Sequence, residues 1–263
     1  MHSREYELYL KRLKRNKFLV VITQILILVF LIFIWEYLSR SNIINAFIYS
    51  SPSKIVNTII KLYNDNNLFN NIWITVYETI ISFVLATLLG TIIAIILWCS
   101  KFLYKVIDPY LIVLNSLPKV ALGPIIIILC GANIKSIIIM ALLISLIITI
   151  TNVYSGFVNT DKNRIKLMQS FHASKWQMLK YLIIPYNYHV IVGTLKISVG
   201  MSLVGVIMGE FLVSKSGIGY LINYGSQVFN LNLVFAGIII LLIVSYLMYL
   251  IVLYIEKVLI RNN

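Results

Sequence analysis

Charged residues are scarce in this sequence. They make up 12% of the 263 residues, and only nine of them are acidic. A soluble globular protein carries about 25% charged residues, so there are too few here to cover a water-facing surface. Hydrophobic residues reach 60%, with a mean hydropathy of +0.92. No long polar stretch remains for a second, soluble domain. The composition therefore predicts one all-α membrane domain.

Residues that build metal and disulfide sites are also rare. The two cysteines, Cys99 and Cys130, lie in apolar surroundings without a CxxC spacing, which is typical of inert buried thiols. The three histidines are dispersed, so no metal site is expected. The nine acidic residues are dispersed too, which argues against a membrane enzyme. We therefore expect no catalytic residues and no cofactor in this chain.

Two further absences limit the function. The sequence has no GxxxxGK[ST] phosphate-binding loop, so any ATP hydrolysis must occur in another subunit. The net charge of +13 is concentrated at the ends of apolar runs, and it forms no basic patch with interleaved aromatic residues. Nucleic acid is therefore not an expected partner.

Six apolar runs are long enough to cross a bilayer as helices, which takes about 20 residues. The expected spans are 18–38, 76–98, 109–131, 135–157, 188–213 and 233–256. Pro118 and Pro124 interrupt the third span, and Lys196 lies inside the fifth. The first span follows a basic segment and lacks a small-x-small cleavage site, so we expect an uncleaved helix.

The distribution of positive charge predicts the orientation. With the N-terminus inside, fifteen Lys and Arg residues lie on the cytoplasmic side and five on the outside. The excess of positive charge belongs on the cytoplasmic side. We therefore expect a cytoplasmic segment over 1–17, a membrane domain over 18–256 and a cytoplasmic tail over 257–263, with both termini inside.

The longest external segment, 40–75, has a helical pattern of its own. Ser51-Pro52-Ser53 is typical of a helix start, and Ile55, Ile59, Leu62 and Tyr63 recur at helical spacing. Two interpretations remain open. The segment is either an amphipathic helix on the outer membrane surface or an ordinary packed connector.

The loop over 158–185 is the most informative segment. Asp161 or Thr160 can cap a first short helix, on which Leu167 and Phe171 share one face. Ser174-Lys-Trp-Gln177 fits the capping box of a second helix. A solvated connector would not need both Phe171 and Trp176 near its turn. The pattern favours a loop that docks into a groove on another protein.

The loop resembles the EAA loop of binding-protein-dependent ABC importer permeases, E-A-A-x₃-G-x₉-I-x-L-P. Aligned on Pro185, Leu182 and Ile184 take the Ile and Leu places, and His172 takes the Gly place. Lys166-Leu167-Met168 stands where the family has Glu-Ala-Ala, so the spacing is kept while the residues differ. The run Ala173–Gln177 is similar to the family's A-S-R/K-W-Q. His tolerates a positive φ better than most residues if the turn requires one.

Further segments resemble the nitrate, sulfonate, taurine and thiamine-precursor branch of this superfamily, from about residue 30 to 235. They are Trp35-Glu36, Ser51-Pro52-Ser53, Asp108-Pro109, Leu117-Pro118-Lys119-Val120-Ala121-Leu122-Gly123-Pro124, Gly193-x-x-Lys196, Glu210 and Gly217-Ile218-Gly219. The resemblance implies the type I importer permease fold of about six transmembrane helices in the cell inner membrane. A secondary transporter without an ATPase remains the alternative.

The resemblance also implies partners. These are a second permease chain in a homodimer, two ATPase subunits that bind ATP and magnesium, and a substrate-binding protein or lipoprotein that delivers a sulfonate, nitrate, taurine or pyrimidine-like solute. The loop would be the coupling helix, and lipid surrounds the spans. The residues expected to contact the ATPase are Arg164, Leu167, Met168, Phe171, His172, Ala173, Ser174 and Trp176.

Polar groups inside spans usually face protein or water, and they suggest the translocation path. The candidates are Asn115, Ser116, Lys119, Asn152, Lys196, Ser198, Ser202 and Glu210. For the two lysines, an anionic solute, pairing with Glu210 or Glu78, and lipid headgroups all remain open. Ser198 and Ser202 join Gly205 and Gly209 in a small-residue stripe that predicts close helix packing, within the chain or across a dimer. Gly217 to Gly219 should form a tight external turn.

Overall fold

The computed structural model describes residues 4–41 and 43–261, and the regular structure of these residues is helical throughout. The elements in order are α1 (Arg4–Arg40), α2 (Ala46–Tyr49), α3 (Pro52–Asn64), α4 (Asn67–Cys99), α5 (Lys101–Ser116), η1 (Lys119–Leu122), α6 (Gly123–Cys130), α7 (Ile134–Val158), α8 (Lys162–Ser170), α9 (Lys175–Met178), η2 (Leu179–Ile183), α10 (Ile184–Tyr186), α11 (Tyr188–Val213), α12 (Ile218–Gln227) and α13 (Leu231–Arg261). The predicted all-α membrane fold is confirmed.

Five helices among the described residues are long and apolar enough to cross a membrane. Their spanning parts are Phe18–Arg40, Asn67–Cys99, Ile134–Val158, Tyr188–Val213 and Leu231–Val258. They match five of the six expected spans. The second begins nine residues earlier than predicted, because Asn67 to Thr75 continues the helix with mixed polar and apolar residues.

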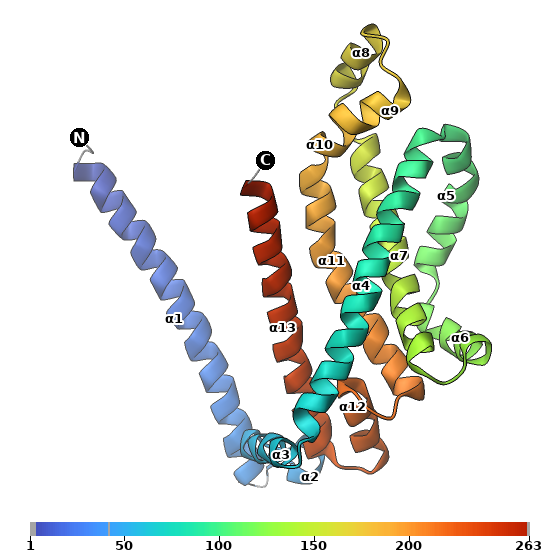
Figure 1. Ribbon diagram of the computed structural model, residues 1–263. Coiled ribbons are helices and arrows are strands. Elements are labelled where there is room, and N and C mark those ends of the chain that lie inside the picture. The colour runs from blue at the N-terminus through green and yellow to red at the C-terminus, as the bar shows by residue number, and fades with distance from the viewer. Residues whose placement is uncertain (1–3, 42, 262–263) are drawn as a thin grey trace.

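The expected span over 109–131, which the sequence shows to be interrupted by prolines, corresponds to a bent pair of helices. The chain forms α5 and then η1 with α6, and the two parts are bent by 96°. Leu117, which precedes Pro118, has φ −67° and ψ 138°, the extended conformation that a following proline imposes. The bent pair still leads from one end of the bundle to the other (Figure 1). Six crossings therefore result only when the pair counts as one.

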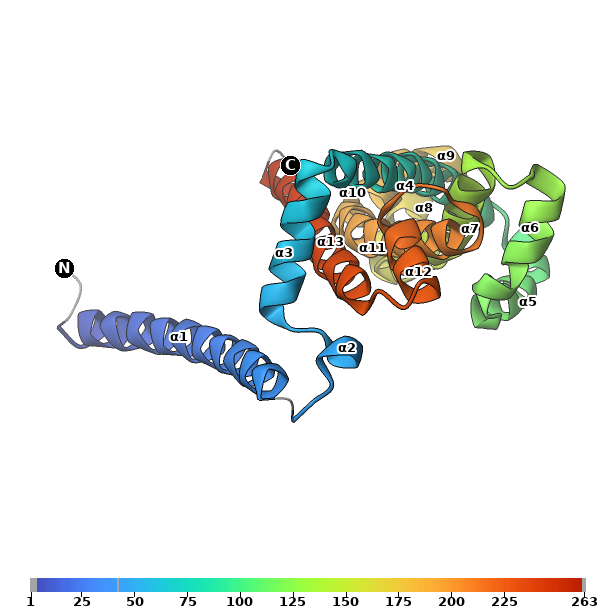
Figure 2. The same ribbon diagram turned by 90° about the horizontal axis from the view of Figure 1, so that it is seen from below.

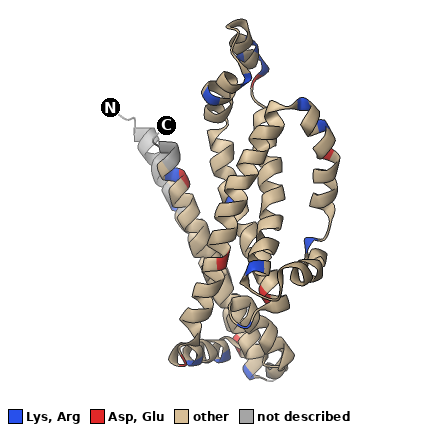
Figure 3. Cartoon of the chain, turned by 45° about the vertical axis from the view of Figure 1, so that its right-hand side comes forward, with Lys and Arg blue, Asp and Glu red and all other residues tan. Residues whose placement is uncertain are grey.

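The two ends of the bundle differ in content. The described ends of α1 and α13 lie at the same end as α8 and α9, while α3 and α12 lie at the opposite end (Figure 1). We call these the loop end and the turn end. Lys, Arg, Asp and Glu gather mainly at the two ends, and long parts of the helices between them carry none (Figure 3). This is the charge distribution of a membrane-spanning bundle.

Helix α1 stands apart from the other helices along most of its length (Figure 2). None of its most apolar window is buried within the chain. It is held at the turn end, where Glu36 Oε2 accepts from Ser53 N at 3.0 Å and Ser39 Oγ donates to Ser50 O at 3.0 Å. The basic segment predicted over 1–17 continues α1 from Arg4, and residues 1–3 and 262–263 of the two predicted tails lie outside the described residues.

The segment over 40–75, which the sequence predicts to be external, contains the predicted helix, α3. Ser51 caps it by accepting from Lys54 N at 3.4 Å. Ile55 is buried, and Ile59 and Leu62 pack against the apolar core between α11 and α13, while Tyr63 is exposed. Helix α3 crosses the turn end of the bundle (Figure 2). It is therefore a packed connector, one of the two interpretations left open.

The centre of the bundle is formed by α4, α7 and α11. A side chain at Gly205 would meet the backbone of Ala141, and one at Gly209 would come within 2.9 Å of Ile137 Cγ2. Ser198 Oγ lies 2.6 Å from Ser145 Oγ. The small-residue stripe thus packs α11 against α7 within one chain, in agreement with the close packing predicted from it.

Candidate functional site

The loop over 158–185 is firmly attached to the bundle at its base. Asn187 Nδ2 donates to Thr160 Oγ1 at 2.7 Å and to Ile183 O at 2.9 Å, which ties the two ends of the loop together. The π-helical turn η2 buries Leu179 and Ile183 in a cluster with Phe157. Both ends of the loop are therefore fixed to the helices beneath it.

The helix starts inside the loop agree with the sequence. Asp161, one of the two predicted caps, accepts from Asn163 N at 2.8 Å at the start of α8. Thr160, the other candidate, lies instead at the base of the loop. The capping box of α9 is complete, since Gln177 N donates to Ser174 Oγ at 3.3 Å and Ser174 N donates to Gln177 Oε1 at 2.7 Å. This reciprocal pair fixes the direction in which α9 begins.

His172 occupies the turn between α8 and α9 with φ +54°. The turn therefore needs the left-handed conformation, which explains the glycine that the resembling loops carry at this place. The turn closes through His172 N to Gln169 O at 2.9 Å and Ala173 N to Met168 O at 3.1 Å. Histidine occupies it at a steric cost that glycine would not have.

The tip of the loop is apolar and exposed. Phe171 is 75% exposed, Trp176 66% and Leu167 57%. Arg164 is exposed as well and lies over the ring of Tyr186, 5.1 Å from its centroid. Large exposed aromatic residues on a fixed element are typical of an interaction site.

A contact that the sequence did not reveal joins the loop to α4. Lys175 Nζ donates to the carbonyl oxygen of Cys99, the last residue of α4, at 3.0 Å. A cation is favoured there, because the last carbonyls of a helix lack partners within it. Lys175 and Cys99 are 76 residues apart, so no local pattern could have paired them.

The first three candidate path residues lie together near the bend after α5. Asn115 and Ser116 are exposed, and Lys119 Nζ donates to Asn115 O at 3.0 Å. They are among the polar groups beside Pro118, where the helix is interrupted. Exposed polar groups at an interrupted helix are compatible with a wet surface.

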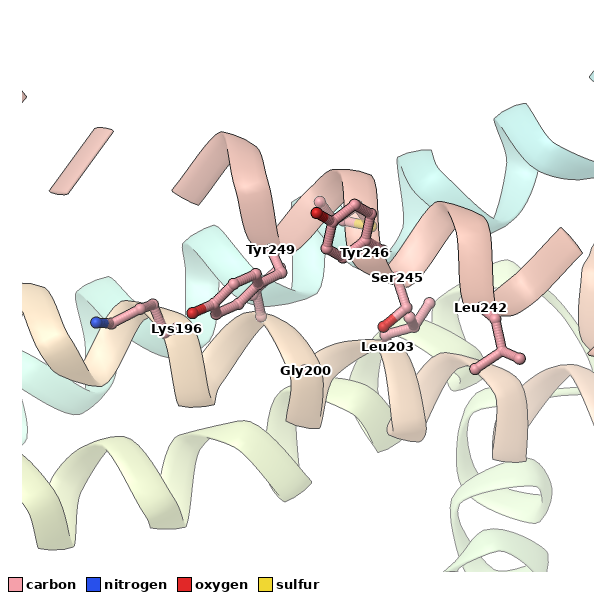
Figure 4. Close-up of a pocket in the computed structure, with 9 residues that line it drawn as sticks. Lys196, Gly200, Leu203, Leu242, Ser245, Tyr246 and Tyr249 are labelled. Carbon is pink, nitrogen blue, oxygen red and sulfur yellow. The ribbon is translucent and has the colours of Figure 1, made fainter. Parts of the chain in front are cut away.

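One of the open interpretations paired Lys196 with Glu78 or Glu210. The structure contradicts it. Its Nζ lies 2.9 Å from Glu256 Oε2 on α13. Lys196 also lines a cavity of about 360 Å³ between α11 and α13, shown in Figure 4 with Tyr249 beside the lysine stem. Gly200 lies on the α11 side of this cavity, where an added Cβ would meet nothing within 4 Å.

Asn152 lines a second cavity, of about 510 Å³, formed by α7, α10 and α11 near the loop end. Its lining is rich in polar groups, including Ser155, Asn159 and His189. Gly193 contributes to it and also has open space where a side chain would be. An exposed strip of α11 that contains Ile197, Gly200 and Val204 adjoins both cavities, since Gly200 lines the first and Ile197 lines the second.

Ser198, Ser202 and Glu210 are buried in the bundle and line neither cavity. Ser198 bonds to α7, as described above. The Glu210 carboxylate is at the start of α12, where Oε2 accepts from Gly219 N at 2.5 Å and Oε1 accepts from Thr75 Oγ1 at 2.6 Å. The predicted turn over 217–219 is thus the first turn of a helix capped by a distant side chain.

The turn is completed from α4. Gly217 has φ +108°, and its N–H donates to Asn71 Oδ1 at 2.6 Å. Ile218 N donates to Thr75 Oγ1 at 2.8 Å. A Cβ at Gly217 would collide with the Glu210 carboxylate. The glycine is therefore required both by its backbone angle and by the close approach of the carboxylate.

Comparison with known proteins identifies the family. The family model of the binding-protein-dependent transport system inner membrane component matches residues 86–261. The chain belongs to this family. The chain is similar to the riboflavin transport system permease protein RibX of Chloroflexus aurantiacus. The two are 26% identical over 61% of the chain, and the match spans 60% of that relative's length.

Two other relatives match over more of their length. The putative aliphatic sulfonates transport permease protein SsuC of Bacillus subtilis is 27% identical over 82% of the chain and 78% of that protein. The formylaminopyrimidine transport permease protein ThiX of Halalkalibacterium halodurans is 26% identical over 80% of the chain and 84% of that protein. A solved structure of the MetNI methionine ABC transporter has the same fold, with a TM-score of 0.65 at 15% identity, covering 73% of this chain and 95% of that one.

Proposed function

We propose that this chain is the permease subunit of an ATP-driven importer in the cell inner membrane. Its family and the permeases it is similar to support this function. The observation that carries the proposal is the exposed aromatic tip, Phe171 and Trp176, on a loop tied to the bundle at both ends. Such a tip is suited to bind a partner protein and to transmit the movement of that partner to the helices of the bundle.

In this proposal the loop is a coupling helix. Phe171, Trp176 and Leu167 insert into a groove on an ATPase subunit, and Arg164 adds a charge at its rim. The turn that presents these side chains is formed by Met168, His172, Ala173 and Ser174. The complex has two permease chains, as a homodimer, and two ATPases that bind ATP and magnesium. Movement of the loop reaches α4 through Lys175 and Cys99.

The loop end is placed in the cytoplasm. The excess of Lys and Arg on that side supports this orientation, because positive residues are retained on the cytoplasmic side. Both termini are then cytoplasmic, and the turn end with α3 and α12 faces the substrate-binding protein or lipoprotein.

We place the path of the solute along the exposed strip of α11 that adjoins the two cavities. Lys196 and Asn152 line these cavities, and Gly193 and Gly200 leave room beside the helix. Asn115, Ser116 and Lys119 would contribute from the bend after α5. The buried face of α11, which carries Ser198, Ser202 and Glu210, packs into the bundle and lies away from the path. The second permease chain would face this strip and close the path.

The relatives' names refer to riboflavin, aliphatic sulfonates and formylaminopyrimidine. These are small organic compounds of different charge, so we propose a small organic solute delivered by the external binding protein. Selection between such compounds would lie mainly in that binding protein.

Co-purification tests the coupling step. The chain is expressed together with candidate ABC ATPase subunits from the same genome, and Phe171→Ala and Trp176→Ala are compared with Trp73→Ala. Trp73 and Trp176 are both 66% exposed, but Trp73 lies in the first turns of α4, away from the loop. Loss of the ATPase is expected for the first two variants only, because removing a central aromatic anchor costs about 2 kcal/mol or more of binding energy.

Two results would contradict the proposal. If a Phe171→Ala, Trp176→Ala double variant still retained the ATPase, the loop would not be the element that binds it. Uptake into vesicles that continues without ATP and stops on adding an ionophore would instead indicate a secondary transporter.

A further inference from the structure

Two acidic side chains meet inside the bundle near the turn end. Glu78 on α4 and Glu210 on α11 are each only 1% exposed. Thr75, which lies one turn before Glu78 on the same face of α4, donates to Glu210 Oε1 at 2.6 Å, so the two carboxyl groups share one buried site. An ionised carboxylate can only accept hydrogen bonds, so two carboxyl groups can bond to each other only when one of them carries a proton.

Basic groups do not neutralise this pair. The ion pairs among the described residues are Arg40–Glu36, Arg164–Asp161 and Lys196–Glu256, and none includes Glu78 or Glu210. The elements packed around the pair present the hydroxyl of Thr75 from α4 and the backbone N–H of Gly219 from α12. Lys215, on the turn before α12, is exposed. Two negative charges in such a site would be strongly unfavourable.

The hydrogen bonds distinguish the two carboxyl groups. Both oxygens of Glu210 accept, from Thr75 Oγ1 at 2.6 Å and from Gly219 N at 2.5 Å. Short bonds to two donors and a place at a helix N-terminus favour a carboxylate. Glu78 Oε2 is buried and has no partner among the described residues. Glu78 is therefore the side chain that can be neutral at a lower cost.

We propose that the Glu78–Glu210 pair is a binding site for a single proton, carried by Glu78 and donated in a hydrogen bond to the Glu210 carboxylate. The proton allows Glu78 to lie beside Glu210, and Glu210 in turn holds the first turn of α12. Asn71 and Thr75 bind the same turn from α4, through Gly217 N at 2.6 Å and Ile218 N at 2.8 Å.

The site makes closure of the turn end dependent on a proton. When the proton leaves, two carboxylates face each other at a position that accommodates one negative charge. The Glu210 carboxylate is then displaced, and α12 loses its cap together with the contacts from α4. This inference concerns the chain's own residues and does not depend on the transported solute.

Infrared spectroscopy of the purified full chain can detect the proton directly. A protonated carboxylic acid has a carbonyl-stretch band that is separate from those of carboxylates and amides. The band is expected at neutral pH in the unaltered chain, absent in Glu78→Gln and present in Glu210→Gln. Glu36→Gln is the matched control, because Glu36 pairs with Arg40 and should not contribute to the band.

A band that is missing from the unaltered chain would overturn the proposal. If stability then depended on sodium or potassium, a cation would occupy the pair. A band that persists in Glu78→Gln and disappears in Glu210→Gln would overturn the assignment of the proton to Glu78.

Hydrogen exchange gives a second readout that a structural role alone would not produce. Raising the pH to alkaline values should speed exchange at the amides of 217–225 by on the order of tenfold beyond the intrinsic increase. Glu78→Gln has no proton to lose at this position, so its exchange should follow the intrinsic increase alone. Equal behaviour of the two proteins would contradict a proton-dependent closure.

Discussion

The backbone N–H of Gly219 donates to Oε2 of Glu210 at 2.5 Å, so a side chain near the end of α11 caps the next helix, α12. The residue at the usual capping position, Gly217, has no side chain to do this. Thr75 on α4 binds the other oxygen of the same carboxylate. One carboxylate thus joins three helices at the turn end.

Replacing Glu210 by alanine should therefore destabilise the protein. Thr75 and Gly219 would lose their acceptor while remaining buried, and each unsatisfied polar group costs about 1–3 kcal/mol. We expect a loss of roughly 3 kcal/mol in the free energy of unfolding, measured by thermal unfolding of the purified protein in detergent. Glu256→Ala is the control, because its carboxylate binds a partly exposed lysine and its removal should cost far less.

The turn at His172 allows a stabilising change. His172 has φ +54°, where an ordinary L-residue is strained by about 1 kcal/mol relative to glycine. His172→Gly should keep the loop conformation and slow its proteolysis, while His172→Val should accelerate cleavage, because a β-branched residue fits this conformation poorly. Faster cleavage of the glycine variant would show that the histidine side chain makes a contact that outweighs the strain.

The sequence predicted much of this architecture, and the residues show why. Spans follow from runs of apolar residues, and the capping box at Ser174 and Gln177 follows from a four-residue spacing; both are local patterns. The 96° bend after α5 was not predicted, because Pro118 marks an interruption but not the direction in which the chain continues.

Contacts between distant residues were the other failure. Pairing with Glu210 or Glu78 was one of three open interpretations of Lys196, and it is wrong, because α13 packs beside α11 and Lys196 binds Glu256. The positions of Ser198, Ser202 and Glu210 within the bundle depend on the rotation of α11 about its axis. Every face of α11 is apolar enough to leave that rotation undetermined by hydropathy, so the buried carboxyl pair could not be recognised from the sequence.

The ion pair between Lys196 and Glu256 should contribute little to stability. The Lys196 side chain is 32% exposed, and partly exposed pairs contribute up to about 1 kcal/mol. Lys196→Met, Glu256→Gln and the double variant form a thermodynamic cycle, with unfolding measured as before. A coupling energy above about 2 kcal/mol would indicate that the pair is more desolvated than its exposure suggests.

The same variants also separate a role in transport from one in stability. If Lys196 lines the path, Lys196→Met should reduce the uptake rate while Glu256→Gln, which leaves the lysine in place, has a smaller effect. Equal losses in the two variants would indicate that the ion pair only holds α13 against α11.

The bond from Lys175 to the end of α4 predicts a defect in coupling that leaves assembly intact. Lys175→Met removes the bond to Cys99 O but keeps most of the apolar stem, and Phe171 and Trp176 are unchanged, so the ATPase should still co-purify. A bond of this kind at an exposed site is worth roughly 1 kcal/mol, or about a fivefold change in an equilibrium. We expect a similar fall in solute-stimulated ATP hydrolysis, measured on the reconstituted complex.

Lys180→Met is the matched control for this prediction. Lys180 lies on the same loop and is exposed, but its Nζ lies over the ring of Tyr181 and makes no bond to α4 among the described contacts. Its removal should leave the stimulated rate nearly unchanged while lowering the loop's charge by the same amount. If both variants lose activity equally, the positive charge of the loop matters for the ATPase and the link to α4 does not. A selective loss in Lys175→Met identifies α4 as the element through which the loop acts on the turn end.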